Sequence, residues 1–168
     1  MEHPNYMGAR DRAQQVLQEN FVVSPPVRVG EIAKNYGLDI TEVELGEDFS
    51  HVSGFIDPEE RVIYVNRSDS DTRKAFTIAH ELGHWLLHQD QLKTDPDRYA
   101  IVYRIPIGRL NIDPVEKEAN VFAANLLVPR EWLDKHTDKN PEEIARIFGV
   151  SPEVIGYRLQ EHEPNRPQ

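Results

Sequence analysis

Hydrophobic and polar positions along this chain recur at two periods, which separate its expected helices from its expected strands. Apolar residues follow the 3.6-residue period of a helix in several stretches, namely 8–19, 30–36, 71–89, 115–128 and, after residue 130, the segments REWLDKHT, PEEIARIFGV and SPEVIGYRLQEH. Alternation at 40–45 predicts a strand, and 51–57 and 61–66 predict a β-hairpin with its turn around Pro58. Three short strands before a long helix predict an α+β fold.

The stretch 71–89 carries two apolar stripes instead of one. The first runs from Phe76 to Leu87 and the second from Ile78 to Trp85. A helix that is apolar on two sides is mostly buried, so polar side chains within it lie in a packed interior. We therefore expect the two histidines at the centre of this stretch to occupy a gap in the core.

These two histidines belong to the pentapeptide HELGH, residues 80–84. On a helix, the rings of His80 and His84 lie one turn apart on one face and can share a metal ion, while Glu81 can reach water at that ion. This is the zinc-hydrolase signature HExxH. The alternative, two hydrogen-bonded core histidines, gives Glu81 no reason to be there. The sequence therefore predicts metal ligands at His80 and His84 and a catalytic base at Glu81.

A catalytic zinc ion usually has three protein ligands, so a third must come from elsewhere in the chain. Asp113 and Pro114 are typical of the start of a helix over 115–128. Glu116 has a structural role there, because it can close a capping box with Asp113. Glu118 has no such role, and a carboxylate on an otherwise apolar helix is costly unless it meets a cation. The sequence therefore favours Glu118 as the third ligand, with Glu116 next.

The residues just after the signature are weaker ligand candidates. His88 lies about 6 Å further along the helix axis than His84, so we expect it at the surface or behind a ligand. Asp90 stands where the metzincin pattern has its last ligand, but that pattern needs glycine where this chain has Leu87. The segment 90–113 is predicted to be irregular, with one edge strand. It is either a connector or a wall of a substrate groove.

The expected metal and chemistry follow from these ligands. Two imidazoles and a carboxylate suit Zn2+ best, and Mn2+ is also possible. Peptide hydrolysis at such a site also needs a hydrogen-bond donor for the oxyanion besides the metal. The sequence offers several candidates and does not choose among them: Tyr64, Tyr99, Tyr103 and Arg104.

The composition excludes several classes of protein. The chain has 168 residues and no cysteine, which excludes disulfides and thiolate metal sites. A net charge of −10 opposes direct attraction to nucleic-acid phosphates. No apolar run reaches the roughly 18 residues of a membrane span, and the start of the chain has no apolar signal region. We therefore expect a cytoplasmic protein with neither a membrane nor a nucleic acid as direct partner.

Two segments together resemble the ImmA/IrrE family of metallo-endopeptidases, RKAFTIAHELGHWLLH at 73–88 and EKEANVFAANLLVP at 116–129. The similarity extends to GFIDPEERVIYVN at 54–66 and PEEIARIFGVSPEVIGYRL at 141–159. The resemblance implies a compact zincin, with a small antiparallel sheet beside the HExxH helix and a second helix that brings the glutamate preceding Ala-Asn, Glu118. It also implies a zinc-dependent endopeptidase whose protein partner is a helix-turn-helix transcriptional repressor.

The expected organisation is a zincin-like core over 1–129, a helical extension over 130–163 packed on it, and a frayed tail over 164–168. The sequence pattern of the extension is typical of a helix-turn-helix, with Gly149 at the turn and Ser151 capping the next helix. Its excess of acidic residues disfavours binding in a DNA groove. Two other functions stay open, a non-catalytic protein-binding module of a toxin–antitoxin or repressor system and a DNA-binding protein with a structural metal.

Overall fold

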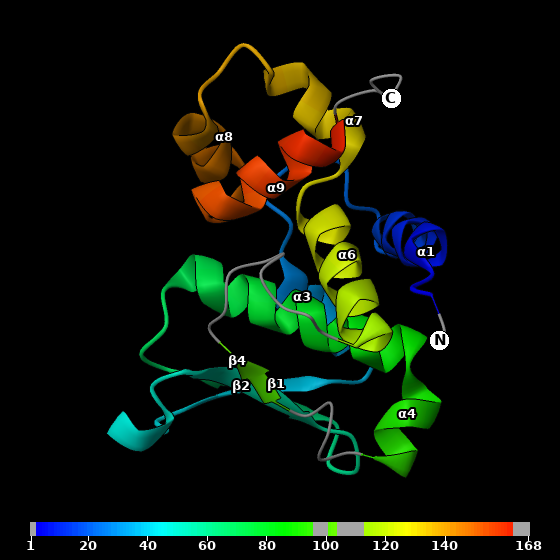
Figure 1. The fold of residues 1–168 in the computed structure, drawn as a ribbon, viewed down its shortest axis with the longest axis vertical. Helices are drawn as coiled ribbons and strands as arrows, with labels where there is room; N and C mark the ends of the chain where they lie inside the picture. The colour runs from blue at the N-terminus through cyan, green and yellow to red at the C-terminus, as the bar shows by residue number, and fades with distance from the viewer. Residues whose placement is uncertain (1–2, 96–100, 104–112, 163–168) are drawn as a thin grey trace.

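The computed structural model describes residues 3–95, 101–103 and 113–162 (Figure 1), so the expected tail lies outside the described residues. In chain order the elements are α1 (Tyr6–Glu19), α2 (Val29–Asn35), β1 (Asp39–Val43), β2 (Val52–Asp57), β3 (Val62–Asn66), α3 (Asp71–Leu87), α4 (Gln89–Thr94), β4 (Ile101–Tyr103), α6 (Pro114–Leu127), α7 (Arg130–Leu133), α8 (Pro141–Phe148) and α9 (Pro152–His162). The expected α+β class is confirmed. Among the described residues, no helix combines the length and the apolarity needed to cross a bilayer.

Within the described residues, four strands form one mixed sheet in the order β1-β3-β2-β4. β2 pairs antiparallel with β3 and with β4, whereas β1 pairs parallel with β3, Ile40 lying beside Ile63. The expected antiparallel sheet is thus right for β2 and wrong for β1. The cause is the hairpin, because β3 turns back into the direction of β1 and lies between β1 and β2.

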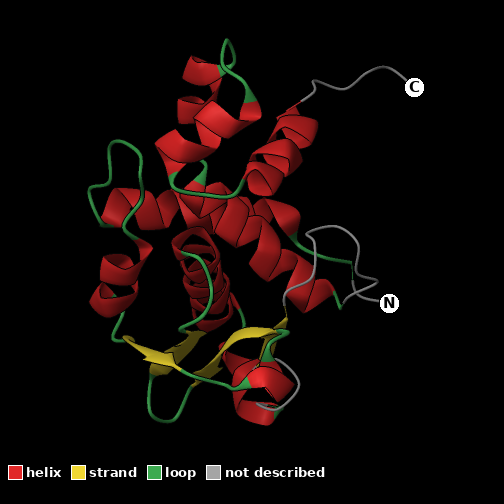
Figure 2. Ribbon diagram, turned by 90° about the vertical axis from the view of Figure 1, so that its left-hand side faces the viewer, coloured by secondary structure: helices red, strands yellow, loops and turns green. Residues whose placement is uncertain are grey.

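Helix α3 packs on β2 and β3, and most of the helices lie on that side of the sheet (Figure 2). It begins after Ser70, whose Oγ accepts a hydrogen bond from the Arg73 N–H at 3.2 Å. The close approach of sheet and helix depends on Gly54 in β2. A Cβ at this position would clash with the Tyr64 carbonyl oxygen and would lie 2.7 Å from Thr77 Cγ2. A side chain here would therefore push the hairpin away from α3.

Helix α6 packs on both α1 and α3 (Figure 1). The contact with α3 is close because position 83 is glycine. A Cβ on Gly83 would lie 2.9 Å from Phe122 Cδ1 and 3.4 Å from Ala119 Cα, and both of these α6 residues are fully buried. This packing places the first turns of α6 against the centre of α3, where the HELGH sequence lies.

Helices α8 and α9 form a pair that shares the apolar core of the rest of the chain. Asn140 and Glu143 make the capping box of α8, in which Asn140 Oδ1 accepts from the Glu143 N–H at 2.9 Å. The helix ends at Phe148, and the C-cap that follows is Gly149, whose φ of 67° lies in the left-handed region that favours glycine. Ser151 Oγ then accepts from the Val154 N–H at 3.3 Å. Local sequence predicts each of these three caps.

Candidate metal centre

Three buried histidines at four-residue spacing lie along α3 and at its C-terminal cap. His80, His84 and His88 lie on successive turns, with only 3%, 0% and 3% of their surface exposed. The helix ends at Leu87, and the N–H of His88 still bonds the His84 carbonyl oxygen at 2.8 Å. His88 is therefore buried behind His84 and does not lie at the surface.

Two of these imidazoles and one carboxylate form a triangle of donor atoms. The Nε2 atoms of His80 and His84 are 3.1 Å apart. Glu116 places Oε2 at 3.1 Å from His80 Nε2 and Oε1 at 3.0 Å from His84 Nε2. Nitrogen ligands about 2.05 Å from a tetrahedral zinc ion are separated by about 3.3 Å. The spacing of the triangle therefore suits three ligands of one such ion.

The carboxylate at this triangle belongs to Glu116, whereas the sequence favours Glu118. Glu118 Oε2 instead accepts a hydrogen bond from His88 Nε2–H at 2.8 Å, and its Oε1 accepts one from the Asn5 backbone N–H at 2.7 Å. Two residues turn a helix through about 200°, so the two carboxylates leave α6 in different directions. The structure thus brings Glu116, and not the favoured Glu118, to His80 and His84.

The Glu116 side chain contacts the two histidines, and Asp113 caps the helix. Asp113 Oδ1 accepts from the Val115 N–H at 2.8 Å, and the Glu116 side chain turns inward. A sequence signal for this arrangement existed. Glu116 and Asn120 are four residues apart and share one face of α6, and Asn120 Oδ1 accepts a hydrogen bond from His80 Nδ1–H at 2.8 Å.

Burial and hydrogen bonding together determine the charge of these groups. It lowers the pKa of His84 to about 4, because a charged imidazole is unfavourable in the interior. Burial alone raises the pKa of Glu116, but its hydrogen bonds with His80 and His84 outweigh that effect and leave the pKa well below its ordinary value. A neutral His84 and an ionised Glu116 are the forms in which these side chains bind a divalent ion.

Glu81 completes the arrangement from within α3. Its side chain is fully buried, and neither carboxylate oxygen has a hydrogen-bond partner among the described residues. Burial raises the pKa of Glu81 well above its ordinary value, and the negative charge of Glu116 adds to the shift. A buried carboxylate without a partner is costly for folding alone. A buried carboxylate that the charge of Glu116 reaches suits proton transfer at an ion held by the triangle.

The remaining candidates lie away from the triangle or outside the described residues. Asp90 is exposed on α4. Tyr64 stacks on Phe55, with ring centroids 4.8 Å apart, and points to the opposite face of the sheet from the buried Ile63. The other possible oxyanion donors lie outside the described part of the chain, namely Tyr99, Arg104 and the side chain of Tyr103.

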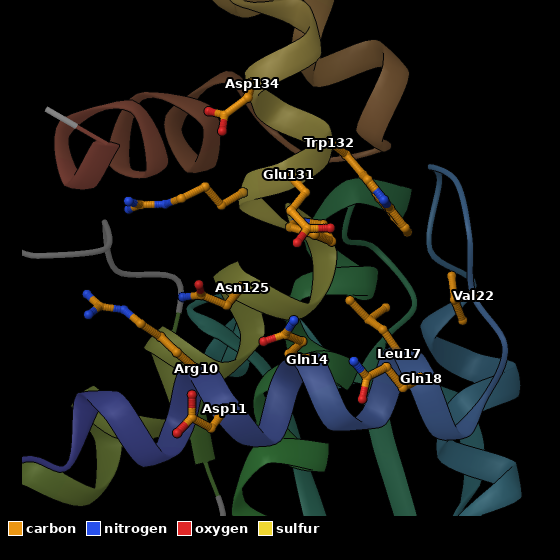
Figure 3. Close-up of a pocket in the computed structure, with 12 residues that line it drawn as sticks. Arg10, Asp11, Gln14, Leu17, Gln18, Val22, Asn125, Glu131, Trp132 and Asp134 are labelled. Carbon is orange, nitrogen blue, oxygen red and sulfur yellow. The ribbon is translucent and has the colours of Figure 1, made fainter. Parts of the chain in front are cut away.

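A separate pocket of about 560 Å³ lies between α1 and the corner where α6 meets α7 (Figure 3). Its lining is mixed, with both charges and a few apolar side chains, among them Arg10, Asp11, Leu17, Arg130 and Trp132. None of the triangle residues lines it. The pocket is thus a different part of the molecule from the candidate metal centre.

Comparison with known proteins identifies the family. Residues 33–160 match the model of the peptidase M78 family, described as the IrrE N-terminal-like domain. The chain belongs to this family. The family resemblance seen in the sequence is thereby confirmed.

Three similar proteins extend this comparison. The radiation response metalloprotease IrrE of Deinococcus radiodurans is 33% identical over 136 residues, which are 76% of this chain and 38% of that protein. The uncharacterized immunity region protein 2 of Bacillus phage phi105 is 30% identical over 84% of both chains. A solved Mycobacterium tuberculosis transcriptional regulator has a TM-score of 0.68 at 19% identity and covers 95% of this chain and 48% of its own. The chain thus spans less than half of the curated IrrE protein and of that regulator.

Proposed function

We propose that this protein is a metal-dependent endopeptidase that binds Zn2+ through His80, His84 and Glu116. The observation that carries the proposal is the triangle of donor atoms, with separations of 3.0 to 3.1 Å. The buried carboxylate of Glu81 on the same helix as the two histidines adds to it. Membership of the peptidase M78 family and the metalloprotease name of the IrrE relative support it. Mn2+ is the next candidate, because a site of two imidazoles and one carboxylate can also bind it.

The chemistry requires one contribution from the ion and several from the chain. A divalent cation at this site supplies a Lewis acid that polarises a peptide carbonyl and lowers the pKa of water. Glu81 accepts the proton of the attacking water and then delivers it to the leaving amine. Burial raises the pKa of Glu81, which makes this carboxylate a stronger base than an exposed glutamate. Asn120 holds the His80 ring with Nε2 directed into the triangle.

The substrate class that we propose is a regulatory protein, and specifically a helix-turn-helix repressor. Two of the similar proteins support a regulatory role, since one is named as an immunity region protein and another as a transcriptional regulator. Direct DNA binding by α8 and α9 has less support. Arg158, one of two cations in these helices, is 1% exposed and bonds the Val128 carbonyl oxygen and Glu161, which leaves Arg146 among exposed glutamates.

The test is proteolysis by the Zn2+-loaded protein of a helix-turn-helix repressor encoded beside its gene, and of a peptide mixture prepared from a bacterial proteome. Mass spectrometry should find discrete cleavage products that the Glu81→Gln protein does not make. Absence of products from both substrates with fully metal-loaded protein would contradict the peptidase proposal. If the Glu81→Gln protein still acts on its repressor or toxin–antitoxin system in cells, the non-catalytic binding module would be favoured instead.

A further inference from the structure

A chain of hydrogen bonds leads away from the candidate metal centre and involves residues that the proposed chemistry does not use. His84 Nδ1 lies 3.1 Å from His88 Nδ1. His88 Nε2 lies 2.8 Å from Glu118 Oε2, and Glu118 Oε1 lies 2.7 Å from the Asn5 backbone nitrogen. The chain thus joins α3 to α6 and then to the start of α1.

The positions of the hydrogens in this chain follow from its two ends. The Asn5 N–H can only donate and the Glu118 carboxylate can only accept, so His88 Nε2 carries the hydrogen that it donates to Glu118. In a neutral imidazole the other nitrogen is then unprotonated, so His88 Nδ1 accepts a hydrogen bond. His84 must therefore donate through Nδ1–H. This leaves the lone pair of His84 on Nε2, the atom that faces His80 and Glu116.

We propose that His88 and Glu118 are positioning residues that hold the His84 ring in the Nδ1–H form and aim its Nε2 at the metal. This inference rests on the metal site of the proposed function and adds residues to it. The two ligand histidines are then oriented differently. His80 donates to a neutral amide, Asn120. His84 donates to His88, which in turn donates to the carboxylate of Glu118. Such a carboxylate makes an imidazole a stronger ligand.

The burial of His88 argues that the chain is built for orientation. His88 is 3% exposed, so each of its ring nitrogens needs a partner, and it has one on each side. A leucine or phenylalanine at this helix end would satisfy packing without that requirement. The simplest competing role is a buried polar pair that stabilises the contact of α3 with α6. The two roles differ in what they do to metal affinity.

The test compares Zn2+ affinity, measured by competition with a chelating dye, in His88→Phe, Glu118→Gln and the double variant. We expect His88→Phe to weaken Zn2+ binding by about 10- to 100-fold and Glu118→Gln by about tenfold. Because Glu118 acts through His88, the double variant should bind no more weakly than His88→Phe alone. Asp90→Asn, which removes an exposed charge on α4 close in sequence, should leave the affinity unchanged. Additive losses, or no loss in either single variant, would overturn the proposal.

Further variants separate orientation from folding. His88→Gln restores an acceptor and a donor about 2.2 Å apart, close to the spacing of the two ring nitrogens, so it should recover most of the affinity lost in His88→Phe. The melting temperature of the metal-free protein monitors packing. A loss confined to that temperature, with Zn2+ affinity intact, would overturn the proposal in favour of the structural role. If His88→Phe does not fold, Glu118→Gln and His88→Gln still decide the question.

A matched pair of substitutions tests the far end of the chain, and a third variant tests the metal site itself. Asn5→Ala and Asn5→Pro both lose the side-chain cap of α1, but only Asn5→Pro loses the N–H that Glu118 accepts. Asn5→Pro should therefore bind Zn2+ more weakly than Asn5→Ala, and equal affinities would remove Asn5 from the chain. His80→Ala should abolish tight Zn2+ binding. If it does not, the proposed metal site is wrong. If His80→Ala loses Zn2+ affinity but the His88 variants do not, only the positioning role of His88 and Glu118 is wrong.

Discussion

The polar contacts at the start of α6 and those in the helix pair α8–α9 join residues at very different separations along the sequence. In α8–α9 the caps join neighbours in sequence, Asn140 with Glu143 and Ser151 with Val154. At the α3–α6 contact, His80 meets Glu116 and Asn120 from 36 and 40 residues away. The first kind of contact can be predicted from local sequence. The second depends on how two helices rotate about their axes when they pack.

The largest expected effect tests the chemistry of the α3–α6 contact. Glu81→Gln should reduce cleavage by several orders of magnitude while Zn2+ content stays near that of the unchanged protein, because Gln keeps the shape of the side chain and cannot accept the proton. Rates on a cleaved peptide and metal analysis of the same preparations measure both quantities. A Glu81→Gln enzyme of near-normal rate would remove the proposed base, and loss of Zn2+ would make the residue a ligand.

The next effect separates the two carboxylates of α6. Glu116→Gln should weaken Zn2+ binding by at least about a hundredfold, since structural zinc sites bind with about 10–16 kcal/mol shared among four ligands. Glu118→Gln, which acts through His88, should weaken it by about tenfold. Dye competition on the two variants gives the comparison directly. The opposite order would return the third ligand to Glu118, as the sequence alone favours.

A smaller effect contrasts the packing of the two regions through the same substitution. In Gly83→Ala the new Cβ meets the buried Phe122 ring at 2.9 Å, and we expect about 1–2 kcal/mol of destabilisation from overpacking. In Gly156→Ala, on α9, the Cβ meets nothing within 4 Å, so helix propensity should stabilise the protein by about 0.5–1 kcal/mol. Urea unfolding of both metal-free variants measures this. If Gly83→Ala also raised the free energy of unfolding, the α3–α6 contact would be looser than its distances indicate.

The smallest effect concerns a contact between neighbours in sequence. Asn140→Ala removes the side chain that caps α8 and should cost about 1 kcal/mol of stability. Zn2+ affinity should not change, because α8 contributes no residue to the triangle. Thermal unfolding and dye competition on one preparation test both statements. A drop in Zn2+ affinity would mean that the two regions are coupled.

The helices other than α4, the hairpin and two of the three triangle residues could be predicted from the sequence, whereas α4 (Gln89–Thr94) lies mostly where an irregular segment was expected. His80, Glu81 and His84 lie on one helix, so their mutual geometry is set by the helical period. Glu116 could not be assigned in this way, because its capping role was equally consistent with its position in sequence. The parallel pairing of β1 with β3 was missed for a similar reason. A strand pattern predicts which residues alternate and does not say which neighbour the strand will have.

By itself the sequence determined which side chains are available for a metal and that two of them share one helix face, because a helix repeats its own geometry over four residues. Only the tertiary structure decided which glutamate of α6 meets them and that His88 and Glu118 stand behind His84. These depend on the rotation and the close approach of α6 against Gly83. Packing of the whole core sets that rotation, and no local spacing encodes it.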